Sequence, residues 1–491
     1  MPAKKPRSRR SRWLAGGLGP ALDPRLQIVA LVCLVLAAFT IRMYRLGELP
    51  DTVLGDEADN VQYAARILYG IAPPGGFFGV DWTPQPAFSV YKQALFIALF
   101  GFNVAAMRLP SALISALALI PFYFLLRRHL SFLAAFLATT LLATNVWYLN
   151  FSRSGWNNID VCFYMLIAML FLMLALDSLK LPEQEWRRTW IYFGAAGFSC
   201  ALGLYAYPAG RAIPLAVAAF LPVALLLYAK HRRLLLRGYI VLIAVMMLVF
   251  APEAIYAAGH WERFNGRTNV VLIFNHPDYA ADPAGTLIRH VSRNLRSPWD
   301  GSVNNTPQYS PLGEPQLDRI TGALALAGMV LTLAVGKLRR RGETWLWWFM
   351  LLAGWMLTQL LTAHTPNGAR GIGYMPALIF FAAVALDTLI QALSTLAAAR
   401  RWPPIAGTAA VGLVSVAVIV VGFANVAHYV QWQSEPKTRQ QRYIYLTVEE
   451  FPRWAADIMQ RAANGEGITN LGMWREAYPI ADPSNPYGAT P

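Results

Sequence analysis

The sequence has little charge and almost no cysteine. Only 14% of its 491 residues are charged, against about a quarter in soluble globular domains, and this shortage excludes an ordinary soluble protein. The three cysteines, Cys33, Cys162 and Cys200, all lie inside apolar runs and show no metal-ligand spacing. We interpret them as small packing residues, which say little about the redox compartment.

Sequence signatures of nucleotide and metal sites are missing as well. The chain has no Gly-rich phosphate-binding loop and no CxxC or HxxxH pair. Acidic residues are scarce, since 27 Asp and Glu stand against 42 Lys and Arg, for a net charge of +15. The basic residues cluster in short loops between apolar runs, which indicates membrane topology rather than a nucleic-acid-binding groove.

Long apolar runs dominate the chain, of which 56% is hydrophobic. Each run approaches the ~20 residues that a helix needs to cross a bilayer. The runs predict an all-α polytopic membrane protein with about eleven transmembrane helices. The predicted spans are residues 26–44, 105–126, 132–149, 159–179, 190–207, 212–228, 239–258, 320–335, 345–363, 373–393 and 404–428.

The placement of arginine predicts the orientation of these spans. With a cytoplasmic N-terminus, every inside loop holds an Arg pair or triplet, whereas the outside loops hold mostly isolated charges. These inside groups are Arg127-Arg128, Arg187-Arg188, Arg232-Arg233, Arg339 to Arg341 and Arg400-Arg401. We therefore expect a basic cytoplasmic tail over residues 1–25 and a retained first span, because no small-residue cleavage site follows it.

The same topology predicts the outer side of the molecule. The transmembrane domain, residues 26–428, has a first outer loop at 45–104 and a large outer loop at 259–318, and a short outer tail covers 429–491. A further span through 90–102 would invert every later loop, so we interpret that segment as an amphipathic interfacial helix. Long loops between spans are uncommon unless they are functional, which directs the search for a site to the outer face.

An acidic motif, Leu54-Gly55-Asp56-Glu57-Ala58-Asp59, begins the first outer loop. Asp56 is our candidate catalytic residue, with Glu57 as a partner that orients it or contacts a substrate. The alternative is a helix start, in which Asp56 is an N-cap and Asp59 assists it. The two interpretations are compatible with each other.

Several stretches together resemble the dolichyl-phosphate-mannose–protein mannosyltransferases (glycosyltransferase family 39) of the C-type glycosyltransferase superfamily, to which the lipid A aminoarabinose transferase is related. The resemblance extends over most of residues 26–393. It is carried by Gly55-Asp56-Glu57-Ala58, residues 64–70, 94–101 and 107–113, Asn150-Phe151-Ser152-Arg153, Tyr205-Ala206-Tyr207 with Arg211, and residues 311–315.

The resemblance implies a reaction, in which a sugar moves from a polyprenyl-phosphate carrier to an acceptor hydroxyl on the outer face. Such a reaction needs a base for the hydroxyl, for which Asp56 is assigned. It also needs cations for the leaving phosphate and an apolar groove for the lipid. The acceptor, whether protein, lipid or glycan, stays open, and we expect the plasma membrane of a prokaryote. The missing nucleotide loop fits a lipid-linked donor.

The candidate ligands of the donor phosphate are polar residues near the outer ends of predicted spans. They are Lys92, Arg153, Tyr207, Arg211, His364 and Arg370. Each also has a simpler explanation. Lys92 and Arg153 could extend to the interface as ordinary snorkelling side chains. Arg211 and Tyr207 could anchor a span in the aromatic belt. His364 and Arg370 could belong to a plain turn.

The sequence departs from the family pattern at two positions. Relatives often carry a Lys before a Pro-Pro-Leu stretch in the first loop, whereas this chain reads Trp82-Thr83-Pro84-Gln85-Pro86. The family's Ser-Arg pair is followed closely by an Asp, whereas Asp160 lies seven residues after Arg153. The resemblance makes Asp56 and Asp160 the candidates for a divalent metal ion, and whether a metal is used stays open.

A transporter or flippase of lipid-linked sugars is the rival interpretation. Such proteins need ionisable residues along a path through the membrane, and often internal repeats or broken helices. The middle of the predicted spans is nearly free of charge, and no repeat is evident. The pattern therefore favours chemistry at one face over passage. A non-catalytic scaffold with a decayed site is a third interpretation, against which the intact Asp56-Glu57 pair speaks.

Overall fold

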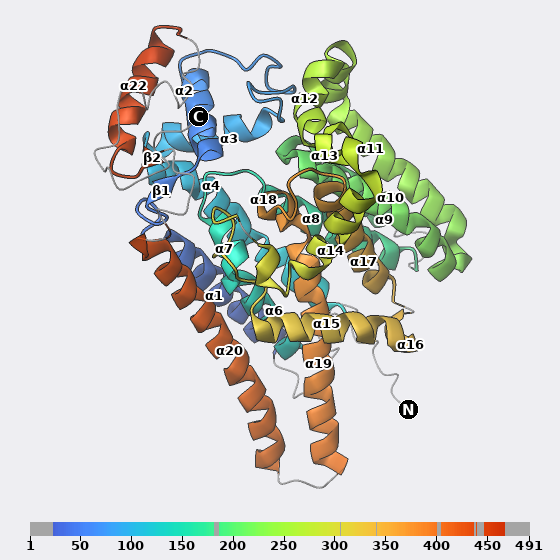
Figure 1. Ribbon diagram of the computed structural model, residues 1–491. Coiled ribbons are helices and arrows are strands. Elements are labelled where there is room, and N and C mark those ends of the chain that lie inside the picture. The colour runs from blue at the N-terminus through green and yellow to red at the C-terminus, as the bar shows by residue number, and fades with distance from the viewer. Residues whose placement is uncertain are drawn as a thin grey trace.

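The computed structural model describes residues 23–180, 186–304, 306–339, 341–399, 404–436, 438 and 446–466. Most of the predicted cytoplasmic tail, the Arg400-Arg401 pair and the chain beyond residue 466 lie outside these ranges. The described chain is mainly helical (Figure 1). Its longer helices are α1 (Pro24–Met43), α2 (Gly55–Leu68), α3 (Phe88–Phe100), α4 (Val104–Leu117), α5 (Leu119–Arg127), α6 (Phe132–Thr144), α8 (Asp160–Ser178), α9 (Trp186–Ala206), α10 (Ala212–Leu227), α11 (Arg232–Gly259), α12 (Trp261–Val271), α14 (Pro283–Arg296), α15 (Arg319–Ala334), α17 (Gly342–Trp355), α19 (Met375–Ala399), α20 (Pro404–Ser434) and α22 (Phe451–Ala463).

Short elements connect these helices. They are the strands β1 (Thr52–Val53) and β2 (Leu446–Thr447), the short helices α7 (Val146–Ser152), α13 (Pro277–Ala281), α16 (Gly336–Arg339) and α18 (Gly368–Gly371), the 3₁₀ turns η3 (Pro208–Arg211), η4 (Ala229–His231), η5 (Ile273–Asn275), η6 (Gly301–Val303) and η8 (Ile372–Tyr374), and the π-helical turn η7 (Met356–Leu360).

Each of the eleven predicted spans coincides with one helix or one consecutive pair of helices. Seven helical segments in the described chain are long and apolar enough to cross a membrane, and the bent pair α6 and α7 would be an eighth. The all-α polytopic architecture is therefore confirmed, while the number eleven stays a prediction. Residues 88–100 form the separate helix α3, which exposes Leu95, Leu99 and Phe100, as an interfacial helix would.

Polar caps explain where several spans begin. Asn103 accepts a hydrogen bond from Ala106 N (2.9 Å) and starts α4, and Ser131 does the same for α6 through Ala134 N (3.2 Å). Asn145 ends α6 and caps α7 through Tyr148 N (3.0 Å), where the chain bends by 60°. These side chains satisfy backbone N–H groups that a helix leaves without partners.

The helices divide into a buried centre and a lipid-facing edge. Two thirds of the apolar windows of α4–α5, α8 and α19 are buried, whereas only 17% of that of α20 and 28% of that of α11 are buried. Close backbone contact supports the centre, since a Cβ added at Gly328 in α15 would lie 1.7 Å from the Phe381 carbonyl oxygen in α19. The exposed apolar faces of α11 and α20 are suited to lipid.

The predicted first outer loop and the C-terminal segment fold together at one end of the spans. β1 pairs antiparallel with β2, with Thr52 opposite Thr447. Residues Phe451–Ala463 form α22, whose buried Phe451, Trp454 and Ile458 join a hydrophobic cluster with Val53, Ala58, Val61 and Ala65. Figure 1 shows α22 beside α2 at the top of the molecule. The C-terminal segment thus supports the helix that begins with the acidic motif.

Candidate active site

The acidic motif opens helix α2, and its second carboxylate is part of the structural framework. Glu57 is 1% exposed. Its Oε2 accepts a hydrogen bond from Leu54 N (3.0 Å), the helix N-cap, while its Oε1 accepts from Gly155 N (2.5 Å) and faces Arg108 Nε at 3.3 Å. Glu57 therefore fastens the helix start to two other segments.

Arg108 completes this framework. It is fully buried, and its guanidinium donates to the carbonyl oxygens of Leu46 (3.2 Å), Pro50 (2.8 Å) and Thr52 (2.8 Å). These bonds hold the chain between α1 and α2. The motifs at 55–58 and 107–113, which are separate in sequence, therefore meet at one buried ion pair, to which the Gly155 backbone is also bonded.

Asp56 lies on another side of α2 and has different surroundings. It is partly exposed. Burial by the neighbouring residues raises the pKa of Asp56, whereas the positive charges of Arg267 and Arg370 and a hydrogen bond from the Trp156 side chain act to lower it. Two arginines from distant loops and an indole thus converge on one carboxylate.

Two further carboxylates flank Asp56 in the first outer loop. Burial raises the pKa of Asp59 to about 7, with a smaller contribution from the charge of Asp56. Burial also raises the pKa of Asp81 to about 8, although Asp81 accepts hydrogen bonds from Thr83 Oγ1 (3.1 Å) and Gln85 N (3.3 Å). The acidic side of the site therefore has groups that gain or lose protons near neutral pH.

A cavity opens beside the arginines. Its empty volume, including the mouth, is about 780 Å³. Polar side chains of Gln85, Tyr207, Arg211, Arg267, Thr268 and Arg370 occupy part of its wall, and apolar side chains of Val271, Leu272, Leu357 and Leu361 occupy another part. Concave sites of this size, mainly apolar with a few convergent polar groups, are typical of ligand binding. We call this space the arginine cavity.

The three arginines of the arginine cavity come from three elements. Arg211, in η3, donates through Nη1 to Thr268 Oγ1 (2.9 Å), and its guanidinium lies 5.0 Å from the Phe264 ring centre. Arg370, in α18, donates through Nη1 to Ala363 O (2.8 Å). Arg267 lies on α12, in the predicted large outer loop. Each arginine keeps N–H groups that could bind an anion.

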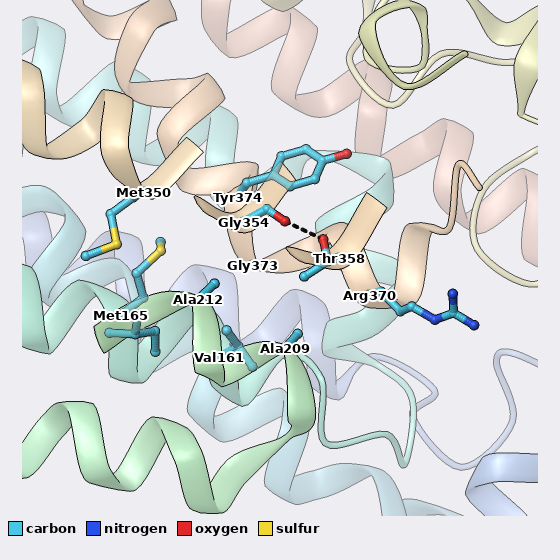
Figure 2. Close-up of a pocket in the computed structure, with 11 residues that line it drawn as sticks. Val161, Met165, Ala209, Ala212, Met350, Gly354, Thr358, Arg370, Gly373 and Tyr374 are labelled. Carbon is cyan, nitrogen blue, oxygen red and sulfur yellow. Dashed lines mark hydrogen bonds between the residues drawn. The ribbon is translucent and has the colours of Figure 1, made fainter. Parts of the chain in front are cut away.

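A smaller apolar pocket adjoins the arginine cavity and shares Ala209, Thr358 and Arg370 with it. Figure 2 shows Met165 and Met350 side by side in this pocket, and the Arg370 side chain pointing away from them. The Thr358 hydroxyl donates to Gly354 O (2.7 Å) and is thereby satisfied within its own helix. The pocket extends the apolar part of the site between the spans.

The structure places the predicted residues in two groups. Arg211, Arg370 and Tyr207 line the arginine cavity beside Asp56. Arg153 instead binds the end of α1, since Nη1 donates to the carbonyl oxygens of Ile41 and Arg42 (both 2.7 Å). Its phosphate-binding role stays a prediction that this geometry does not support.

Three further predicted residues have partners of their own. Lys92 forms an ion pair with Asp160, and both side chains are largely buried. The His364 ring packs edge-on against that of His276, with the centroids 5.1 Å apart. Neither contact places these residues among the groups that act on Asp56, so we do not carry them into the proposed site.

Sequence reasoning missed Arg267 and Trp156. Arg267 is one of several charged residues in a 60-residue loop, and no motif distinguishes it. The signal was the helical spacing of Phe264, Arg267, Thr268 and Val271, which puts these residues on one face of α12. Recognising what that face covers requires knowing that α12 folds back onto Pro84 and Gln85.

The two predicted metal candidates, Asp56 and Asp160, have different surroundings. Asp160 is paired with Lys92, and this ammonium group competes with any cation for the carboxylate. Across the described ranges, no group of three or more His, Cys, Asp or Glu side chains is arranged to hold a metal ion. We derive no step of the reaction through a metal.

Comparisons with known proteins agree with this architecture. Residues 84–256, about a third of the chain, match the family model described as dolichyl-phosphate-mannose-protein mannosyltransferase. A search of curated protein sequences finds no significant match.

Two solved structures share the fold at low sequence identity. One is the archaeal oligosaccharyltransferase AglB from Archaeoglobus fulgidus, in complex with an inhibitory peptide and a dolichol-phosphate, with a TM-score of 0.58 and 16% identity over 91% of this chain. This chain covers 61% of the AglB chain. The other is ArnT from Cupriavidus metallidurans bound to undecaprenyl phosphate, with a TM-score of 0.50 and 15% identity over 89% of this chain and 76% of that one. With the family match, these likenesses confirm the resemblance: the chain is a polytopic membrane protein that shares the fold of these two structures, and about a third of it is similar to the dolichyl-phosphate-mannose-protein mannosyltransferases.

Proposed function

We propose that this protein transfers a sugar from a polyprenyl-phosphate carrier to an acceptor hydroxyl on the outer face of the membrane, with Asp56 as general base. The observation that carries the proposal is the position of Asp56 beside the arginine cavity, which is cationic in one part and apolar in another. A polyprenyl phosphate has two matching parts, an anionic phosphate and an apolar lipid chain. The two solved structures support the donor class, because one holds dolichol-phosphate and the other undecaprenyl phosphate.

The arginine cavity matches such a donor part by part. We assign the phosphate to Arg267 and Arg370, the two arginines whose charges act on Asp56, with Arg211 beside them. Guanidinium groups suit phosphate because they are always charged and donate several hydrogen bonds in one plane. The first isoprene units would lie along Leu272, Leu357 and Leu361, where apolar contact replaces contact with lipid tails.

Asp56 then acts on the acceptor. The acceptor oxygen attacks the anomeric carbon of the donor sugar, the bond from that carbon to the phosphate oxygen breaks, and the phosphate leaves with the electron pair. The hydroxyl proton passes to the Asp56 carboxylate. A raised pKa makes this carboxylate a stronger base than a free Asp, and the arginines stabilise the charge that develops on the phosphate. A single displacement inverts the anomeric centre, as in inverting glycosidases.

The surrounding framework holds this carboxylate in place. Glu57, next in the chain, is bonded to Leu54, Gly155 and Arg108, so the first turn of α2 has little freedom. A rigid first turn keeps Asp56 at a fixed distance from the arginine cavity, which favours proton transfer in the reacting complex. The Lys92–Asp160 pair and Arg153 take no part in the proposed chemistry.

The proposal is tested with purified protein in lipid vesicles that contain radiolabelled polyprenyl-phosphate sugars. One assay follows transfer to a crude envelope acceptor, and a second follows movement of the donor across the bilayer. We expect wild-type protein to transfer sugar, Asp56→Asn to bind donor without transferring it, and Asp278→Asn, at an exposed outer carboxylate, to behave as wild type. Donor movement without transfer in both wild type and Asp56→Asn would instead establish the flippase interpretation.

A further inference from the structure

Helix α11 buries a carboxylate that the proposed chemistry does not use. Glu253 is 1% exposed, and its Oε2 is buried without a hydrogen-bond partner in the described structure. An unsatisfied buried polar atom costs free energy. An ionisable residue in a membrane-spanning helix is, in addition, rare unless it serves a function.

Glu253 lines a pocket of its own next to the arginine cavity. The empty volume of this pocket is about 330 Å³, and it shares Pro208, Arg211 and Thr268 with the arginine cavity. The remaining wall is apolar and partly aromatic, with Phe250 and Phe264 among its residues. We call it the Glu253 pocket. A group bound in the arginine cavity can therefore extend past Arg211 toward Glu253.

Arg211 does not satisfy Glu253 as a simple counter-ion. The Arg211 charge acts on the Glu253 carboxyl, but no ion pair between the two occurs among the described residues. Arg211 instead donates to Thr268 Oγ1 and stacks on Phe264. Oε2 of Glu253 is thus an acceptor in a small, mostly apolar pocket, next to the proposed donor site.

We infer that the Glu253 pocket is a recognition subsite for the donor sugar, in which a sugar hydroxyl donates a hydrogen bond to Glu253 Oε2. This inference rests on the proposed function, because it takes the phosphate of the donor to lie at the arginines. A hydroxyl group supplies the donor that Oε2 lacks, and the C–H face of a sugar ring packs well on Phe264 and Pro208. A lipid phosphate without a sugar has no group that reaches Glu253.

The experiment measures binding of two kinds of lipid to purified protein in detergent. The first is polyprenyl phosphate without a sugar, and the second is a panel of polyprenyl-phosphate sugars carrying mannose, glucose or arabinose. The variants are Glu253→Met, which keeps the approximate size of the side chain but has no acceptor oxygen, and Glu262→Met as a matched control at an exposed position on α12. Binding of the sugar-free lipid reports whether Glu253→Met is folded.

We expect Glu253→Met to weaken binding of the preferred sugar lipid about tenfold, the usual size of one lost hydrogen bond. Its affinity for sugar-free polyprenyl phosphate should stay within about twofold of wild type, as should both affinities of Glu262→Met. Three outcomes would overturn the inference: equal weakening of both kinds of lipid, weakening of neither, or wild-type protein that binds no sugar lipid more tightly than the sugar-free lipid. If wild-type protein bound none of the lipid phosphates, the proposed function itself would fail.

Discussion

Asp56 and Glu57 are neighbours in the chain, yet they belong to two different regions. Glu57 is buried, paired with Arg108 and bonded to two backbone N–H groups. Asp56 is partly exposed beside the arginine cavity and acted on by Arg267 and Arg370. The acidic motif therefore contributes one residue, Glu57, to the structural framework and one, Asp56, to the proposed chemistry. The comparison teaches that an acidic pair read as one catalytic unit can divide its roles between adjacent residues, because consecutive residues of a helix point about 100° apart.

The largest expected effect, and the strongest test of the difference between Asp56 and Glu57, comes from removing the charge of Asp56. We expect Asp56→Asn to lower the transfer rate by about 10²- to 10⁴-fold, the usual contribution of a general base. Its melting temperature should not fall, because a partly desolvated charge is replaced by a neutral group. Steady-state transfer and thermal unfolding are measured on the same preparation. A variant with half of the wild-type rate would show that Asp56 is not the base.

The corresponding change at Glu57 should affect the folding stability of the protein. Glu57→Ala leaves the buried Arg108 guanidinium without its carboxylate, and breaking such a pair costs about 3–5 kcal/mol of folding free energy. We expect a large fall in melting temperature and in the yield of folded protein. Glu48→Ala, which removes one side of the exposed Arg45–Glu48 pair, is the matched control and should have little effect. Normal stability of Glu57→Ala would contradict the framework role.

The charge of Arg267 acts on Asp56, and its removal sharpens the comparison. Its positive charge lowers the pKa of Asp56 against the effect of burial, so Arg267→Ala should raise that pKa. Since the base must be deprotonated, the acid limb of the kcat/KM profile should move to higher pH. Donor binding should also weaken, by about tenfold for one lost charge-assisted contact. An unchanged acid limb would show that Arg267 does not act on the base.

The smallest expected effect concerns Asp81, on the acidic side of the site, where the charge of Asp59 acts on it. Its folded-state pKa of about 8 exceeds the ordinary value of 3.8, so folding favours the protonated form. The contribution of Asp81 to folding stability is then lost as pH rises between these two values, and this loss is complete above about 8. We expect Asp81→Asn to raise the melting temperature at pH 8.5 and to change it little at pH 4. Thermal unfolding at both pH values checks this, and equal effects at both would contradict it.

The membrane topology could be predicted from the sequence because apolar runs and Arg pairs report it directly. Each predicted span has a helical counterpart, and α3 was predicted to lie apart from the spans. The small sheet of β1 and β2 was not predicted, because two-residue strands leave no periodic signal. Its formation depends on residues 446–447 returning to residue 52, a contact that no local pattern encodes.

The candidate site could be predicted only where a motif and a place on the fold coincide. Asp56, Tyr207, Arg211 and Arg370 meet at the arginine cavity. Arg153 looked similar in sequence, but its guanidinium is taken up by backbone carbonyl groups at the end of α1. Lys92 and Asp160, 68 residues apart, pair with each other. Tertiary packing decides which charged side chains bind one another or the backbone and which line the cavity. The spacing of residues in the sequence does not report this.

The central claim is that the donor phosphate lies at the arginines with its sugar next to Asp56. The most direct test is a structure of the Asp56→Asn protein with a polyprenyl-phosphate sugar bound, because this variant should hold the donor without consuming it. We predict that the phosphate contacts Arg267 and Arg370 and that the anomeric carbon lies between the phosphate and residue 56. A phosphate bound elsewhere, for example at Lys92 after displacement of Asp160, would contradict the account.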